Sequence, residues 1–161
     1  MGITATLYNL AEDEFKNLPD DEFEVINILI PSDIYSNERF CNLDKSWSVI
    51  HYLLCGSPEP DGSVLGDAIL GGEETKIEMD YGPAKYRPPS RVAEINNALA
   101  NVDLEERYDK LVLSSEALKD VYLSAEFAEE GVESIQGFFD ELKGFYAKAA
   151  SENLAIVSYL A

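Results

Sequence analysis

The chain is poor in cysteine, histidine and tryptophan, and this scarcity limits the chemistry that it can perform. Its 161 residues include two cysteines, one histidine and one tryptophan. Cys41 and Cys55 are too few for a disulfide framework, and no C-x-x-C spacing occurs. Zinc sites take several His or Cys ligands, so a single histidine argues against one. We expect neither a metal site nor a cofactor.

Long apolar segments are absent as well. The N-terminal sequence MGITATLYNL has no basic region followed by an apolar run, so it does not look like a signal peptide. No uninterrupted apolar stretch approaches the roughly 18 residues of a membrane span. We therefore expect a soluble, cytoplasmic protein whose thiols stay reduced.

Positive charge is scarce. Lys and Arg number 12 against 31 Asp and Glu, which gives a formal net charge of -19. A strongly negative surface disfavours binding to nucleic acid or to anionic membranes. It is compatible with a basic protein partner, or with acidity that serves solubility alone. The oligomeric state is not readable from these numbers.

Common catalytic and nucleotide-binding motifs are missing too. The glycine-containing segment LGDAILGG lacks the G-x-G-x-x-G spacing, and neither a P-loop nor a G-x-S-x-G elbow occurs. The absence of a recognisable catalytic constellation favours a noncatalytic protein and leaves its status as an enzyme uncertain.

What the chain does have is an ordinary apolar content of 46%, suited to one domain over residues 1–161 with a sizeable core. Apolar patterns predict strands at both ends, over residues 3–10 and 154–160. Helical patterns fill the interval between them. The expected fold class is α+β, with a small mixed sheet that includes both chain termini and several packed helices.

Helix signals are clearest in the second half of the chain. Apolar residues three and four apart predict a long helix over residues 130–153. Pro89 fits the first turn of a helix that reaches residue 100, and Asp103 with Glu106 forms a capping pair for the next helix. A further short helix is predicted over residues 114–121.

Signals in the first half are weaker. Asn9 and Glu12 resemble a capping box for a short helix to residue 18, and a helix is favoured over residues 23–30. Asn42 or Asp44 would cap a helix over residues 44–55. Two prolines close the segment 81–89, so any strand there is predicted to be short or at a sheet edge.

The segment LDKSWSVIHYLLCG, residues 43–56, concentrates rare side chains on one short element. Trp47 and His51 are four residues apart and share a helix face. His51 is the candidate general acid or base beside an aromatic platform. The alternative is a core helix in which Trp47 packs and His51 makes one hydrogen bond. Lys45 suggests an ion pair with a distant acid, or a ligand contact.

The loop of residues 81–91 is the densest basic island in the chain. Cations close to a helix N-terminus favour anion binding, although they can also simply pair with the surplus acids. Together with the Trp47 helix, this loop supplies the candidate ligand-binding set Trp47, His51, Tyr81, Lys85, Tyr86 and Arg87.

The order of these segments resembles the YfbM-like family, a bacterial domain family of unknown function. The resemblance rests on the N-terminal strand, LDKSWSVIHYLLCG, LGDAILGG, YGPAKYRPPSRV, and the long helix with its terminal strand. The region before Cys41 matches poorly. Family members usually carry Arg where this chain has Lys85, and Lys cannot reproduce bidentate Arg geometry. The resemblance implies an α+β domain and no activity.

Three functional hypotheses follow. The first is a noncatalytic binding or interaction domain, whose ligand is a protein partner or a small anion near the Trp47 helix and the 81–91 loop. The second is an enzyme acting on a small anionic substrate, with His51 as acid or base and Lys85 or Arg87 as anchor. It requires His51 in an open cleft. The third is an acidic immunity-type protein that neutralises a basic partner.

Overall fold

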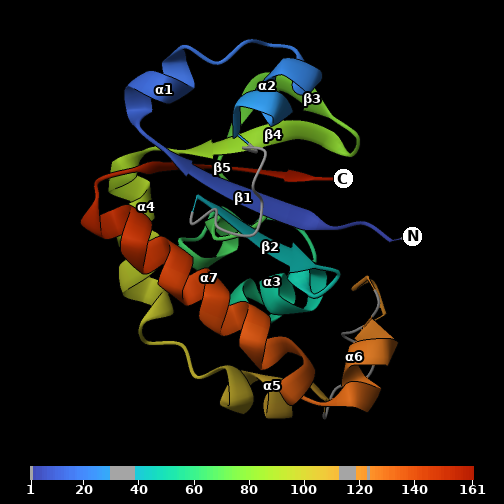
Figure 1. Cartoon of the computed structure of the whole chain (residues 1–161). Coiled ribbons are helices and arrows are strands. Elements are labelled where there is room, and N and C mark those ends of the chain that lie inside the picture. The colour runs from blue at the N-terminus through green and yellow to red at the C-terminus, as the bar shows by residue number, and fades with distance from the viewer. Residues whose placement is uncertain (1, 30–38, 113–118, 123) are drawn as a thin grey trace.

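The computed structural model describes residues 2–29, 39–112, 119–122 and 124–161, and Figure 1 shows their arrangement. One five-stranded sheet has the order β2-β1-β5-β4-β3. Its strands are β1 (Ala5–Leu10), β2 (Phe40–Asp44), β3 (Glu73–Met79), β4 (Gly82–Arg87) and β5 (Ala155–Leu160). The α+β class and the strands at both termini are confirmed. All four strand pairs are antiparallel, so the sheet is not mixed.

The first and last strands pair with each other along their whole length. The register runs from Ala5 opposite Leu160 to Leu10 opposite Ala155. Every residue of β1 is buried, because β2 and β5 flank the strand and its side chains enter the apolar cores on both faces of the sheet. The two ends of the chain therefore form the centre of the molecule.

Helices lie on both sides of the sheet (Figure 1). On one face lie α1 (Glu12–Lys16) and α2 (Glu22–Leu29), over the smaller apolar core. On the other face α3 (Trp47–Cys55), α4 (Pro89–Leu99) and α7 (Glu133–Ser151) enclose the larger one. Beyond them lie α5 (Leu104–Val112) and α6 (Ser124–Glu130), and η2 (Leu65–Asp67) is a single 3-10 turn.

The long helix α7 carries much of the larger core. Its side chains at three- and four-residue spacing point inward, and Ile135, Phe139, Leu142 and Tyr146 are at most 1% exposed. Burying one such side chain contributes about 1.5–3 kcal/mol, so this face stabilises the whole domain. Among the described residues, no helix is long and apolar enough to cross a membrane.

Some local predictions need correction. Asp44 does not cap α3: it ends β2 with a φ of 46°, and its N–H donates to the Asn42 side chain. The residue before the helix is Ser46, whose hydroxyl donates to the carbonyl of Leu43 at 2.6 Å. The capping box of α1 uses Glu14, which accepts from the Ala11 N–H at 3.0 Å, rather than Asn9 and Glu12.

The helix expected over residues 23–30 is present as α2, and Pro89 begins α4 as predicted. The helix expected over residues 114–121 falls largely outside the described residues.

The sequence predicts that any strand in the segment 81–89 is short or at a sheet edge. The strand there is β4, with six residues, and it does not lie at an edge, because β3 and β5 flank it. Only Lys85–Arg87 pair with β5, whereas Pro83 lies opposite Glu78 of β3. The N–H that Pro83 lacks is therefore not needed by the β4–β5 ladder.

Candidate functional site

The sheet places Tyr86 and Arg87, two of the six predicted ligand-binding residues, on opposite faces. Successive side chains of a strand point to opposite faces. Tyr86 accordingly joins the core beneath α1 and α2, whereas the Arg87 side chain reaches Ser158 and the carbonyl of Ile69 on the other side. The structure therefore does not bring the six residues into one site.

His51 lies on the core face of α3 and is 0% exposed. Its Nε2 is 3.4 Å from the Cys55 sulfur, and its Nδ1 has no partner that meets hydrogen-bond geometry among the residues that the structure describes. Burial lowers the pKa of the imidazole, which keeps the ring neutral. His51 therefore faces no open cleft, and the requirement of the enzyme hypothesis is not met.

Trp47 anchors the N-terminal segment. It is 8% exposed, and its Nε1 donates to the carbonyl of Ile3 at 2.9 Å. The indole stacks on the Tyr122 ring with centroids 5.9 Å apart. The Tyr122 hydroxyl in turn accepts from the Ile3 N–H at 3.1 Å. Both polar groups of the Ile3 backbone are thus held by these two aromatic side chains.

Arg87 is fully buried and serves the fold. Its guanidinium donates to the carbonyls of Asp67 and Ile69 and, at 2.9 Å, to the Ser158 hydroxyl. Burial lowers the pKa of Arg87, yet arginine keeps its proton in proteins. The buried cation therefore ties the loop around η2 to the sheet and is not available to a ligand.

The other two cations of the basic loop are paired with acids. The Lys85 ammonium lies 2.8 Å from Glu74 of the neighbouring strand and lowers the pKa of that carboxyl. Arg91 contacts Asp67 and Glu94, each at 2.8 Å. The positive charges of the basic loop that resembled an anion site are thus paired with carboxylates of the protein itself.

Tyr81 is the predicted site residue that reaches solvent most fully, at 57% exposure. It lies in the turn between β3 and β4 and borders a cleft of about 710 Å³ at one end of the sheet. We call this the sheet-end cleft. It is lined by Gly2, Ile3, Thr4, Asp44, Lys45, Asp80, Tyr81, Tyr122 and Ala161.

The charges of the sheet-end cleft come from three exposed side chains, Asp44, Lys45 and Asp80. No ion-pair partner of Lys45 lies within the parts of the chain that the structure describes. Asp44 holds a positive φ, which non-glycine residues adopt at a cost and which clusters at functional sites. Two carboxylates against one ammonium favour a cation over an anion here.

Sequence reasoning had singled out Tyr81 and Lys45, but it missed the part played by Tyr122 in this cleft. Tyr122 comes from a distant segment that carries no local signal. Within the described ranges, no three His, Cys, Asp or Glu side chains gather as metal ligands. The sheet-end cleft can therefore bind a ligand through charge and aromatic contact.

Comparison with known proteins agrees with the fold. A family model described as "Domain of unknown function (DUF1877)" matches residues 1–159. No curated protein matches the chain. The crystal structure of YfbM from Escherichia coli, a protein of unknown function, superposes with a TM-score of 0.66 at 18% identity, covering 98% of this chain and 99% of that one. At this identity the likeness concerns the fold alone.

Proposed function

Because this chain belongs to the DUF1877 family, whose description names no activity, we propose its function from the site: a noncatalytic domain that binds a positively charged segment of a partner protein. The sheet-end cleft is the proposed binding site. The observation that carries the proposal is that Asp44, Asp80 and the exposed ring of Tyr81 line the same cleft.

A Lys or Arg side chain would find three kinds of interaction there. Asp44 and Asp80 offer charge-assisted hydrogen bonds, which are about twice as strong as neutral ones. The face of the Tyr81 ring attracts a cation by about 0.5–1 kcal/mol at an exposed site. The net charge of -19 would also steer a basic partner toward the protein.

The two other hypotheses have less support. An enzyme on an anionic substrate would need an accessible acid or base and a free anchor, whereas His51 and Arg87 are buried and Lys85 is paired. An immunity-type role is favoured by one observation, the exposed acids of α5 and α6. These are Glu105, Glu106, Asp109, Glu126, Glu129 and Glu130.

The test compares two neutralising double variants with the same loss of charge. Asp44→Asn with Asp80→Asn alters the cleft, and asparagine tolerates the positive φ at position 44. Glu105→Gln with Asp109→Asn alters α5. Binding of a short Arg-Gly peptide is measured by calorimetry at two salt concentrations, and a peptide with citrulline in place of Arg serves as the neutral probe.

We expect the cleft variant to bind the Arg-Gly peptide about tenfold more weakly than the unaltered protein, which corresponds to about 1.4 kcal/mol. The α5 variant should bind it as the unaltered protein does. Equal weakening in both variants would mean that net charge alone attracts the peptide. Weakening confined to the α5 variant would move the site to the surface that the immunity-type hypothesis uses.

A further inference from the structure

A second cavity lies on the face of the sheet that carries α1 and α2, between α1 and the edge strand β3. We call it the α1–β3 groove. Its volume of about 340 Å³ is in the range of small-molecule sites. It is lined by Phe15, Lys16, Leu18, Asp20, Glu73, Glu74, Thr75, Lys76, Ile77 and Tyr86.

The apolar part of this groove is a pair of stacked rings. Phe15 and Tyr86 have centroids 3.9 Å apart and planes inclined by 12°. Leu18 and Ile77 extend the apolar lining. A flat apolar group can continue such a stack, because offset aromatic pairs gain about 0.5–1.5 kcal/mol beyond the area that they bury.

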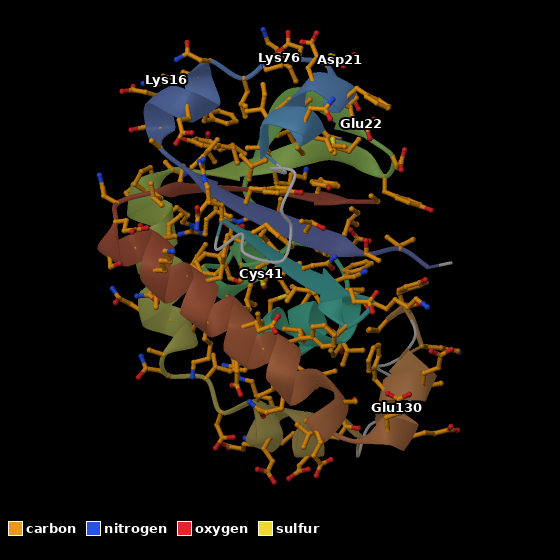
Figure 2. All side chains as sticks on the ribbon, in the orientation of Figure 1. Lys16, Asp21, Glu22, Cys41, Lys76 and Glu130 are labelled. Atoms are coloured by element: carbon orange, nitrogen blue, oxygen red, sulfur yellow. The ribbon has the colours of Figure 1, made fainter. Side chains whose placement is uncertain are left out.

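Charges of both signs surround these rings. Lys16 and Lys76 are exposed, and neither has an ion pair among the residues that the structure describes, although acids outnumber bases 31 to 12. Figure 2 shows both lysines at the end of the molecule formed by α1 and β3. Burial raises the pKa of Tyr86, and the nearby carboxylates of Glu12 and Glu73 raise it further, so negative charge acts at its phenol.

We propose that the α1–β3 groove binds a small zwitterion with a flat apolar body, the chemical class of the aromatic amino acids. The ring of the ligand packs against Phe15 and Tyr86. Its carboxylate faces the ammonium groups of Lys16 and Lys76, and its ammonium faces Glu73 and Asp20. Glu74 takes no part because Lys85 already pairs with it.

The edge strand itself favours a small ligand over an extended segment of another chain. The pairing of β3 with β4 is irregular between Glu74 and Glu78. Within this bulge the Thr75 hydroxyl donates to the Ala84 carbonyl at 2.8 Å and accepts from the Ile77 N–H at 3.2 Å. Bulged and charged edges resist the addition of a further strand.

Three related compounds test the proposal by calorimetry on the full chain. Tryptophan carries both charges, tryptamine lacks the carboxylate, and indole-3-propionate lacks the ammonium. We expect tryptophan to bind saturably and each of the other two to bind about tenfold more weakly. Lys16→Gln with Lys76→Gln should weaken tryptophan binding about tenfold and leave tryptamine unaffected.

The control variant is Lys110→Gln with Lys119→Gln, which removes the same charge from exposed positions outside the groove. Phe15→Leu keeps an apolar side chain and removes the ring, so it should also weaken tryptophan binding. The proposal is overturned if tryptophan does not saturate, if tryptamine binds as tightly as tryptophan, or if the control variant weakens binding equally. None of these results depends on the cationic partner proposed for the sheet-end cleft.

Discussion

Replacing His51 with leucine tests whether the buried imidazole is a structural side chain with no role in proton transfer. The ring is fully buried, and within the described part of the chain Nδ1 lacks a partner with hydrogen-bond geometry. A buried polar atom without a hydrogen bond costs about 1–3 kcal/mol, which leucine would relieve while filling a similar volume. Leucine loses the weak contact to Cys55 and the interaction of the ring with the Glu59 backbone, which offset part of this gain. We expect the free energies of unfolding to agree within about 1 kcal/mol near pH 8, against the 2–5 kcal/mol of a Leu→Ala change in a core.

The pH dependence of stability in the same two proteins is a more specific test, because it reports the charge on His51. Burial holds the pKa of His51 in the folded protein below its ordinary value of 6.5. Below pH 6.5 the unfolded chain therefore binds a proton that the folded protein does not. The free energy of unfolding falls by up to about 1.4 kcal/mol per pH unit until the folded pKa is reached. The His51→Leu variant lacks this loss, so it should become the more stable protein as the pH falls.

No other histidine contributes, because His51 is the only one. Hydrogen bonds lower the pKa values of the carboxyls of Glu14, Asp61 and Glu74, but these groups are present in both proteins, so the difference between the two pH slopes comes from His51. Trp47 is the only tryptophan, so its fluorescence during urea unfolding reports on the transition next to the substituted residue.

Equal pH slopes for the two proteins would refute the reasoning, because they would mean that His51 is charged in the folded state. A loss of more than about 3 kcal/mol in the variant near pH 8 would also refute it, since the imidazole would then make a strong bond. His51→Gln is the control. It keeps a buried polar group that does not titrate, so it should be less stable than His51→Leu, and its free energy of unfolding should lack the contribution of His51 to the pH slope.

Three further substitutions test the structural roles assigned above. Arg87→Met leaves protein acceptors unpaired and should lower the free energy of unfolding by about 2–4 kcal/mol in urea titrations; an unchanged value would show that desolvation of the cation cancels its hydrogen bonds. Gly72→Ala places a Cβ 2.8 Å from the Tyr86 carbonyl at a φ of +112°. It should cost about 1–3 kcal/mol in thermal unfolding, and an unaltered melting temperature would contradict that geometry. Trp47→Phe removes the hydrogen bond to the Ile3 carbonyl and should cost about 1 kcal/mol by circular dichroism, whereas greater stability would mean that this bond contributes nothing.

Local backbone preferences account for the predictions that succeeded. The helix expected over residues 44–55 does end at Cys55, because Gly56 follows it with a φ of 75°, a conformation that glycine adopts without steric cost. Pro89 begins α4, where its missing N–H has no helical partner to lose. The apolar spacing of α7 extends over many turns, so its period is clear within a single segment.

Strands β2 and β3 escaped prediction because their own sequences are weak signals. The strand β3 reads EETKIEM, with charges that suit an exposed edge, and β2 has only the five residues FCNLD. The hydrogen-bonding groups of the β2 backbone are paired with β1, and those of β3 are paired with β4. The pairing of β2 with β1 depends on tertiary structure, since α1 and α2 lie between these two strands in the chain.

The candidate residues show the same division. Sequence alone determined the strongly negative charge, the scarcity of metal-ligating and catalytic side chains, and the positions at which rare residues gather. Only the tertiary structure decided which of them reach solvent. The acceptors of Arg87 lie 18, 20 and 71 residues away in the chain. Glu74 of β3 accepts a hydrogen bond from Lys85 of the neighbouring strand β4. The availability of a charge to a ligand depends on burial and on partners brought together by folding, and neither is a property of a local segment.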